Sequence, residues 1–163
     1  MRRQAGFTMV ELIMVMVMIG VLAAIGIPKL MGGNTTAAMA FGDQVTSALR
    51  HAQKSAVAHR RLVCVALGAR TVGLSIRQAE TVPAATDKTP CNAALQGVDV
   101  GMYDSTDTTV FMTGAPAQLY FQPDGTISGA PAGTPLGKVS IGISLDKARQ
   151  RTIELEGSTG YVE

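Results

Sequence analysis

The sequence predicts an α+β fold in which a long N-terminal helix packs on an antiparallel β head. Three observations predict it: residues 7–27 form an almost unbroken apolar run, residues 35–59 continue it with apolar side chains at helical spacing, and the rest alternates short apolar runs with turn residues. A helix followed by antiparallel strands is an α+β arrangement. The 163 residues suffice for one such domain but not for two large ones.

The apolar run 7–27 predicts a membrane-spanning helix. Only Thr8 and Glu11 interrupt it. At about 1.5 Å per residue the helix would be roughly 31 Å long, which matches a hydrocarbon core of about 30 Å. Arg2 and Arg3 precede it, so the positive-inside rule predicts a cytoplasmic N-terminus and an exported remainder. A buried helix of a soluble protein is an alternative, but it needs a larger core than this chain can build.

A cleavable secretory signal is a second alternative for the same run. Its charged start and apolar stretch fit, and Ala24 and Gly26 are small residues where such a peptidase cuts. Glu11 argues against it, because a carboxylate inside a membrane segment costs about 2.5 to 3.5 kcal/mol and a signal peptide gains nothing from that cost. An acid here points to a function with a partner group.

The start of the run also resembles a known processing signal. The residues are Gly6-Phe7-Thr8-Met9-Val10-Glu11-Leu12-Ile13, after a short basic leader and before an apolar helix that reaches Pro28. They resemble the class III signal of type IV pilins and pseudopilins. The resemblance implies that a prepilin peptidase removes the leader 1–6 by cutting between Gly6 and Phe7, and that the new Phe7 amine is N-methylated. It also implies that the helix stays as a single-pass anchor in the bacterial inner membrane and later packs with other pilin or pseudopilin subunits in a filament.

Glu11 then has a natural partner. Cleavage would create an ammonium group on Phe7 at the edge of an apolar medium, and a buried charge needs a counter-charge. Phe7 and Glu11 are four residues apart, so Glu11 could pair with its own terminus. In a filament it could pair with the terminus of a neighbour and set the subunit register. The alternative is that Glu11 extends to the membrane surface and pairs with nothing.

The helix is expected to continue as an amphipathic segment, so that it spans 7–59. Its second half has apolar residues at spacings of one, three and four, which lie on one helical face. These residues are Phe41, Val45, Ala48, Leu49, Ala52 and Ala56. Pro28, with Gly26 and the Gly32–Gly33 pair, is expected to kink the helix where it leaves the membrane.

Residues 60–163 are expected to form a β-rich periplasmic head. Short apolar runs predict strands, and Gly-, Pro- and Asp-containing turns separate them. The predicted strands are 62–67, 71–76, 98–103, 110–113, 118–122, 138–145, 151–156 and 161–162, with loops over 79–97 and 128–135.

The head carries a looser family resemblance. A cysteine lies in the first strand, a second cysteine follows, and a Phe121-x-Pro123-x-Gly125 turn precedes the terminal segment that starts at Arg151. This pattern resembles the H-type minor pseudopilin and FimT-like group. The resemblance implies a long helix packed on a β head.

Cys64 and Cys91 are the only cysteines in the sequence. If the head is exported, its compartment is oxidising and an even pair is expected to form a disulfide. Two free buried thiols are the alternative. A metal site would need further ligands at suitable spacing, which the two histidines do not supply.

No pattern of catalytic or cofactor-binding residues is present, so we expect neither an enzyme nor a cofactor. His51 and His59 lie two turns apart on the predicted helix, which is not the spacing of a helical metal clamp. Neither a phosphate-binding glycine loop nor a Gly-x-Ser-x-Gly elbow occurs. Asp99, Asp104 and Asp107 lack the spacing of an EF-hand.

Charge is distributed unevenly along the head. Residues 44–79 contain six Lys or Arg and no acid, whereas residues 89–137 contain four acids and no base. Opposed patches suit head-to-tail contacts between subunits, although ordinary solvated surface explains them equally well. Lys147, Arg149 and Arg151 form a second basic cluster, which is a candidate for contact with DNA or a partner. DNA binding is possible but not favoured, because Glu154, Glu156 and Glu163 lie close by.

The sequence therefore predicts a minor pilin-like structural subunit of a type IV filament machine, with the type II secretion pseudopilus favoured. The alternative is a minor type IV pilin that acts in pilus assembly or DNA uptake.

Overall fold

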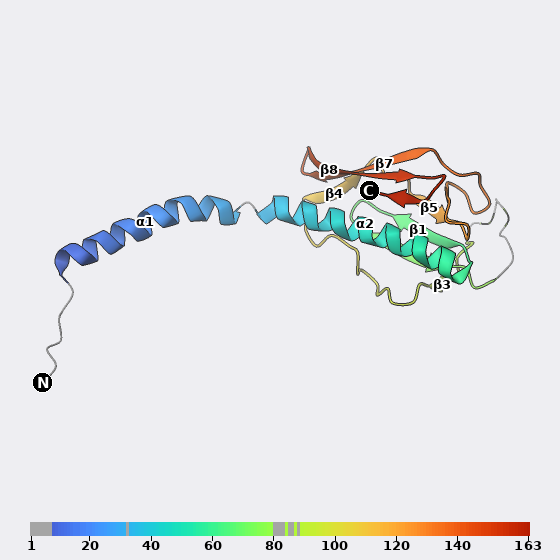
Figure 1. Ribbon diagram of the computed structural model, residues 1–163, viewed down its shortest axis with the longest axis horizontal. Helices are drawn as coiled ribbons and strands as arrows, with labels where there is room; N and C mark the ends of the chain where they lie inside the picture. Colours follow the sequence, from blue (N-terminus) through green and yellow to red (C-terminus); the bar gives the residue numbers. More distant parts are fainter. Residues whose placement is uncertain (1–7, 32, 80–83, 85–86, 88) are drawn as a thin grey trace, which may run out of the picture. The chain divides into compact units, whose positions relative to one another are not determined.

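A computed structural model describes residues 8–31, 33–79, 84, 87 and 89–163 of the chain (Figure 1). The chain divides into two compact units, residues 1–33 and residues 34–163. The first contains helix α1 (Met9–Met31), and the second contains all of helix α2 (Gly33–His59) beyond its first residue together with the strands.

Helix α1 consists almost wholly of apolar residues and begins directly after Thr8. The sequence places a kink at Pro28, which lies inside α1, three residues before its last residue. Gly32 lies outside the described residues, and α2 begins at Gly33. The predicted helix 7–59 is therefore described in two parts, and a kink at Pro28 stays a prediction.

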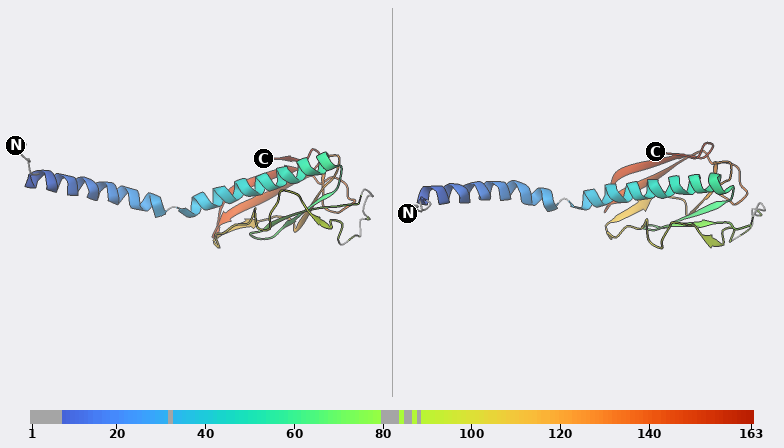
Figure 2. Two further views of the ribbon diagram at one scale, coloured as in Figure 1. Left: turned by 90° about the horizontal axis from the view of Figure 1, so that it is seen from below. Right: turned by 60° about the horizontal axis from the view of Figure 1, so that its bottom comes forward.

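Helix α2 packs on the strands of the head with the face that the sequence predicts (Figure 2). Seven of its side chains are at most 2% exposed, and most of them are alanines, which let the helix approach the strands closely. They are Ala38, Phe41, Val45, Ala48, Leu49, Ala52 and Ala56.

The end of α2 is closed by a Schellman arrangement. Arg60 adopts a left-handed conformation with φ of 52°. The backbone N–H of Arg61 donates to the Ala56 carbonyl at 3.1 Å, and that of Arg60 donates to the Val57 carbonyl at 3.3 Å. This pair of bonds satisfies carbonyls that the last turn leaves free.

The strands form two antiparallel sheets. Sheet A has the order β3-β2-β1-β5-β6, and sheet B has the order β4-β7-β8-β9. Sheet A comprises β1 (Val63–Leu67), β2 (Val72–Ile76), β3 (Ala93–Ala94), β5 (Gln118–Phe121) and β6 (Ile127–Ser128). Sheet B comprises β4 (Val110–Thr113), β7 (Lys138–Leu145), β8 (Ala148–Glu156) and β9 (Tyr161–Val162).

The β7–β8 hairpin is the longest pairing in the head. Its turn is shorter than expected, because β8 begins at Ala148 and Asp146, with φ of 52°, makes the reversal. The register slips between Ile143 and Ser144, so that Ile143 pairs with Arg151 and Ser144 pairs with Arg149. Gln150 is therefore the extra residue of a β-bulge.

The core combines α2 with both sheets. One cluster of buried side chains joins Phe41 and Leu49 of α2 to Phe121 of sheet A and Ile143 of sheet B. The other large members include Leu119, Ile127, Ile141, Ile153 and Leu155. The head is thus held together by one hydrophobic core to which α2 belongs, and burial of this apolar surface is its main stabilising contribution.

Three sequence predictions for the head are wrong, and one of them is the loop 128–135, whose first residue belongs to the unpredicted strand β6. Residues 98–103 form turns, because Gly97 and Gly101 take positive φ values of 77° and 79°, which interrupt a strand. The predicted loop 79–97 contains the short strand β3, which pairs with β2 at Ser75 and Ile76. The other predicted strands are present with boundaries shifted by at most three residues.

Candidate functional site

The N-terminal processing site lies at the edge of what the structure describes. Gly6 and Phe7 fall outside the described residues, so cleavage and methylation there stay predictions. Glu11 lies in the first turn of α1 and is exposed. Its backbone N–H donates to the Thr8 hydroxyl at 3.3 Å and to the Thr8 carbonyl at 3.1 Å.

Thr8 therefore caps α1, a role that the sequence analysis did not assign to it. The signal was present, because Thr8-x-x-Glu11 has the spacing of a capping box. A carboxylate in the first turn also interacts favourably with the helix dipole, by about 0.3 to 1 kcal/mol. Glu11 thus supports the helix start locally, and its side chain is exposed.

The apolar side chains of Met9–Ile27 are not buried by any part of the chain that the structure describes. Residues 9–25 are all exposed, and none of the segment Met9–Ile27 is buried. This segment is long and apolar enough to cross a membrane. Exposed apolar surface on this scale marks a lipid- or protein-contacting surface.

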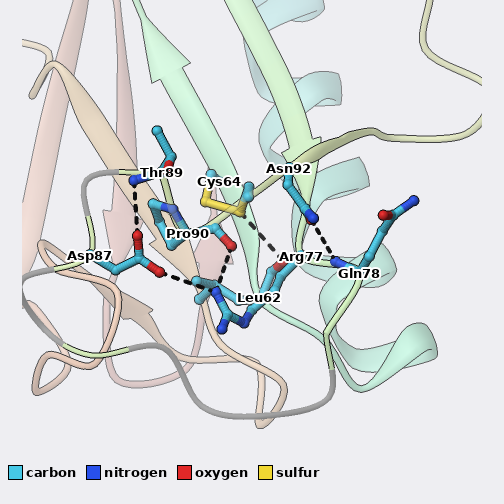
Figure 3. Close-up of polar contacts among 9 residues, drawn as sticks. Leu62, Cys64, Arg77, Gln78, Asp87, Thr89, Pro90 and Asn92 are labelled. Carbon is cyan, nitrogen blue, oxygen red and sulfur yellow. Dashed lines mark hydrogen bonds and ion pairs between the residues drawn. A yellow bond between two sulfur atoms is a disulfide. The ribbon is translucent and has the colours of Figure 1, made fainter.

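Cys64 of β1 and Cys91 form a disulfide (Figure 3). The predicted pairing is therefore confirmed, and their Cα atoms lie 6.1 Å apart. Arg77 fastens the connecting segment, because its guanidinium pairs with Asp87 at 3.3 Å and donates to the Pro90 carbonyl at 3.0 Å. This corner ties the segment after β2 back to β1.

The structure separates the basic cluster predicted at Lys147, Arg149 and Arg151. Lys147 lies in the β7–β8 turn and is exposed. Arg149 and Arg151 are opposite consecutive residues of β7, and consecutive strand residues face opposite sides of a sheet. The bulge at Gln150 therefore turns the two arginines to different faces of sheet B. Arg149 and Arg151 therefore do not contribute to one surface for a nucleic acid.

Arg149 and Arg151 of β8 each pass close to a glycine of a neighbouring element. A Cβ atom on Gly42 of α2 would lie 3.1 Å from Arg151 Cδ, and one on Gly142 of β7 would lie 2.8 Å from Arg149 Nε. Arg151 also forms an ion pair with Asp43 of α2. Arg151 therefore links β8 to α2 instead of extending freely into solvent.

His51, Asp104 and Asp107 make local contacts within the head. His51 Nδ1 lies 3.2 Å from the Tyr103 hydroxyl, and the Asp104 carboxylate accepts from the Val72 backbone N–H at 3.0 Å. Hydrogen bonds from the Thr109 hydroxyl and backbone N–H lower the pKa of Asp107 below its usual 3.8. In the part of the chain that the structure describes, no three His, Cys, Asp or Glu residues are grouped to hold a metal.

A second turn carboxylate behaves in the same way. Asp124 accepts hydrogen bonds from the Thr126 backbone N–H at 2.9 Å and from its hydroxyl at 2.8 Å. These bonds lower the pKa of Asp124 below its usual 3.8. They also hold the turn that leads to β6.

Comparison with known proteins adds one family match. A family model described as the prokaryotic N-terminal methylation motif matches residues 1–27. A search of curated proteins finds no match. The chain is similar to the crystal structure of the type IV minor pilin FimU of Pseudomonas aeruginosa strain PAO1, with 16% sequence identity and a TM-score of 0.49, over 82% of this chain and 88% of that chain.

The matched motif covers the predicted cleavage site, Glu11 and most of the apolar helix. The head that follows has a helix packed on antiparallel sheets. The chain therefore carries a prokaryotic N-terminal methylation motif at the start of an exposed apolar helix, ahead of a head in which a helix packs on antiparallel sheets.

Proposed function

We propose that this chain is a minor structural subunit of the type II secretion pseudopilus, and that it acts by assembly and not by catalysis. The observation that carries the proposal is the methylation motif over residues 1–27 together with an apolar helix, of which Met9–Ile27 is not buried by any described part of the chain. The looser resemblance of the head to H-type minor pseudopilins favours a secretion role over a pilus role.

In this proposal a prepilin peptidase cuts between Gly6 and Phe7 on the cytoplasmic face. Residues 7–27 anchor the protein in the bacterial inner membrane, with the head in the periplasm. During assembly the apolar helix exchanges lipid for the helices of neighbouring subunits. Close packing of side chains between helices then stabilises the filament core, because lipid tails are as apolar as the side chains and give no hydrophobic driving force for the exchange.

Glu11 acts in this assembly as the partner of a terminal ammonium group. It lies in the first turn of α1 with an exposed carboxylate, four residues after Phe7. Pairing with the Phe7 amine of a neighbouring subunit would fix the axial register between two helices. An unpaired charge in the apolar interior would be strongly unfavourable, which gives the pairing its specificity.

Mass spectrometry of the protein from isolated membranes tests the processing step. The mature chain should begin at Phe7, carry one N-terminal methyl group and stay in the membrane fraction. A chain that begins at Ile27 and is released into the soluble fraction would instead establish ordinary secretion and overturn the proposal.

Replacement of Glu11 tests the assembly step. Glu11→Ala and the matched Glu11→Gln should both be cleaved and inserted normally, because neither weakens the apolar run. Both should enter filaments several-fold less well than the wild type. Filament incorporation at the wild-type level would remove the pairing role.

A deletion strain complemented with this chain tests the choice of machine. Loss of protein secretion with normal pili supports the pseudopilus. Loss of pili or of DNA uptake with normal secretion would assign the chain to a type IV pilus instead.

A further inference from the structure

The segment 98–104, between β3 and β4, presents apolar side chains to solvent. Val100 is fully exposed, and Met102 is 51% exposed. The two lie close together in the sequence, although the described part of the head exposes five large apolar or aromatic side chains in all. Single exposed apolar residues are ordinary, whereas grouped ones mark a surface for interaction.

Hydrogen bonds hold this segment in one conformation. The backbone N–H groups of Met102 and Asp104 each donate at 3.1 Å to the carbonyl three residues earlier, which closes two turns. The Tyr103 hydroxyl lies 3.2 Å from His51 Nδ1 of α2. Asp104 Oδ1 accepts a hydrogen bond from the Val72 backbone N–H at 3.0 Å. A surface that is ordered before it binds loses little conformational entropy when a partner arrives.

Beside this segment, sheet A has a hollow of about 520 Å³. This volume lies within the range of about 300 to 1,000 Å³ that is typical of small-ligand pockets. Ala66 of β1 and Gly73 of β2 line the hollow, are paired across the two strands and are both exposed. Because neither has a large side chain, they leave space for a ligand. The larger apolar residues of the lining are Leu67, Val72, Leu74, Val98 and Val100.

The hollow is acidic as well as apolar. Asp99 and Asp104 line it, and among the described residues no lysine or arginine does. Arg70 lies in the adjacent β1–β2 turn, but it interacts with the Asp107 carboxylate and does not line the hollow. The two aspartates give the hollow a formal charge of −2, which favours a cationic ligand.

The hollow follows β2 where β3 does not cover it. In the described part of the chain β3 pairs only with Ser75 and Ile76 of β2. The hollow is lined by the three residues that come before them, 72–74. A short extended segment suits this place, because it can follow the strand and direct alternate side chains into the hollow.

We propose that the hollow binds a short extended segment of another protein, in which one apolar side chain lies between two basic residues. The apolar side chain occupies the space at Ala66 and Gly73, next to Val100. Asp99 and Asp104 pair with the flanking lysine or arginine side chains. The inference goes beyond the proposed function and does not depend on it, because the hollow lies entirely within the head.

Photo-cross-linking with a defined peptide tests the binding. The probe is the water-soluble peptide Gly-Ser-Lys-X-Lys-Ser-Gly, in which X is a leucine analogue with a diazirine group. It is mixed with the full chain in micelles of a neutral detergent and illuminated. Mass spectrometry of the digested protein should find most cross-links on residues 66–74 and 98–104. Cross-links that are spread evenly over the head, or that lie mainly on α1, would overturn the inference.

Competition by peptides without the diazirine tests the chemistry of the ligand. A peptide with Lys-Leu-Lys at its centre should displace the probe. Matched peptides with Glu-Leu-Glu or Lys-Ser-Lys should need about tenfold or more higher concentration, because each lacks one of the two recognised features. Equal competition by Lys-Ser-Lys would show charge attraction alone, and equal competition by Glu-Leu-Glu would show apolar attraction alone. Either result would contradict the proposal.

Gly73→Val tests the hollow by filling it. A Cβ atom at this position would lie 3.8 Å from Ala66 Cβ, which is an ordinary contact, and valine is favoured in strands. The variant should keep the wild-type urea midpoint and capture about tenfold less probe. Gly137→Val is the matched control, because a Cβ there meets nothing within 4 Å and residue 137 does not line the hollow. Wild-type capture by Gly73→Val would refute the site.

Asp99→Lys tests the charge and leaves the strands unchanged, so it also serves if the valine variant fails to fold. Asp99 is exposed, and its reversal should lower capture of the probe about tenfold. Glu163→Lys makes the same charge change at an exposed residue outside the hollow and should leave capture unchanged. Equal losses in the two variants would show an effect of net charge and would reject the proposed pairing.

A second copy of this chain is the alternative occupant of the hollow. Val100→Cys carrying a benzophenone label, illuminated without the peptide, should give no dimer that joins residue 100 to residues 66–74 of another copy. Such a dimer would identify the second copy as the occupant and overturn the inference. A chain that is not cleaved at Gly6 would refute the subunit role and leave probe binding unchanged, so the two failures are distinguishable.

Discussion

Two glycines determine where the arginines of β8 lie. Gly42 of α2 leaves room for Arg151 to cross the helix and reach Asp43, and Gly142 of β7 leaves room for Arg149 on the other face of the sheet. Glycine normally weakens a helix interior by about 1 kcal/mol relative to alanine. At Gly42 the lower helix propensity is offset by the contact between α2 and β8 that the absence of a side chain allows.

Enlarging residue 42 should therefore displace Arg151. Gly42→Leu should destabilise the head by about 1 to 3 kcal/mol, because its side chain would overlap Arg151 and Ile143, which lie 3.1 Å and 3.5 Å from the added Cβ. Gly42→Ala should change the stability by less than about 1 kcal/mol, since the gain in helix propensity offsets a small displacement of a flexible arginine. Urea unfolding of the full chain in detergent, followed by tyrosine fluorescence, measures both. A Leu variant as stable as the Ala variant would contradict this account.

The lowered pKa of Asp124 predicts a contribution to acid stability. A folded-state pKa below the usual 3.8 adds stability that is complete above the unfolded-state pKa and is lost as the pH falls through the folded-state pKa. Asp124→Ala should therefore be less stable than the wild type at pH 7, and the difference should shrink below about pH 4. Unfolding midpoints at pH 7 and at about pH 2.5 measure it.

Asp99→Ala is the matched control for this pH dependence. Asp99 is exposed, and its carboxylate accepts no hydrogen bond within the described part of the chain. Its removal should leave the unfolding midpoint nearly unchanged at both pH values. An equal effect of the two substitutions would show that net charge, and not the Thr126 hydrogen bonds, causes the pH dependence.

At the scale of elements, the disulfide closes a long loop that contains little regular structure. Cys64 and Cys91 are 27 residues apart, and a loop of this length predicts a stabilisation of about 3.5 kcal/mol on the chain-entropy model. Cys64→Ser/Cys91→Ser should therefore lower the free energy of unfolding by about 3 kcal/mol. Urea unfolding with and without reductant measures the loss. If reduction leaves the wild-type midpoint unchanged, the disulfide does not stabilise the head.

The elements that the sequence predicts well are those with a local pattern. Buried residues of α2 recur at helical spacing, and β7 and β8 are long apolar-containing runs beside a tight turn. The apolar helix and Glu11 were predictable for the same reason. The capping role of Thr8 was not predicted, although its Thr-x-x-Glu spacing is also local, because the apolar run alone was used to predict the helix there.

The elements and contacts that the sequence does not predict depend on distant residues. The bulge at Gln150 has no composition signal, yet it decides the faces of Arg149 and Arg151. The ion pair between Arg151 and Asp43 joins residues 108 positions apart, and only the packing of α2 brings them together. Three nearby cations in the sequence therefore suggested one basic surface that the fold does not form.

At the scale of the whole molecule, this separation predicts weak binding to DNA. Phosphate-driven affinity needs several cations on one surface, and it falls with roughly the 0.9 power of salt concentration per phosphate neutralised. Arg149 and Arg151 lie on different faces of sheet B, Lys147 lies in the β7–β8 turn, and Glu154 and Glu156 follow on the same strand. The full chain in detergent should therefore bind duplex DNA no more tightly than about micromolar near physiological salt.

Fluorescence anisotropy of labelled duplex DNA at two salt concentrations measures this affinity. The Arg149→Ala/Arg151→Ala variant should bind DNA as weakly as the wild type. Tight binding by the wild type that this variant loses would contradict the prediction and favour a role in DNA uptake.

Because α2 is part of the head's core, it also determines how the head bears mechanical load. A pull on α1 would reach the head through the start of α2. A force directed along α2 would load the packing of its seven buried side chains at once, whereas a loosely attached helix would detach turn by turn. If a force unfolds the chain beyond His59, the extended segment soon includes Cys64. The disulfide from Cys64 to Cys91 then carries the force, so the 27-residue segment between them is not extended. At about 3.3 to 3.6 Å per residue, the disulfide therefore prevents roughly 90 Å of chain from being extended. In the filament role proposed above, the head would therefore stay short under tension.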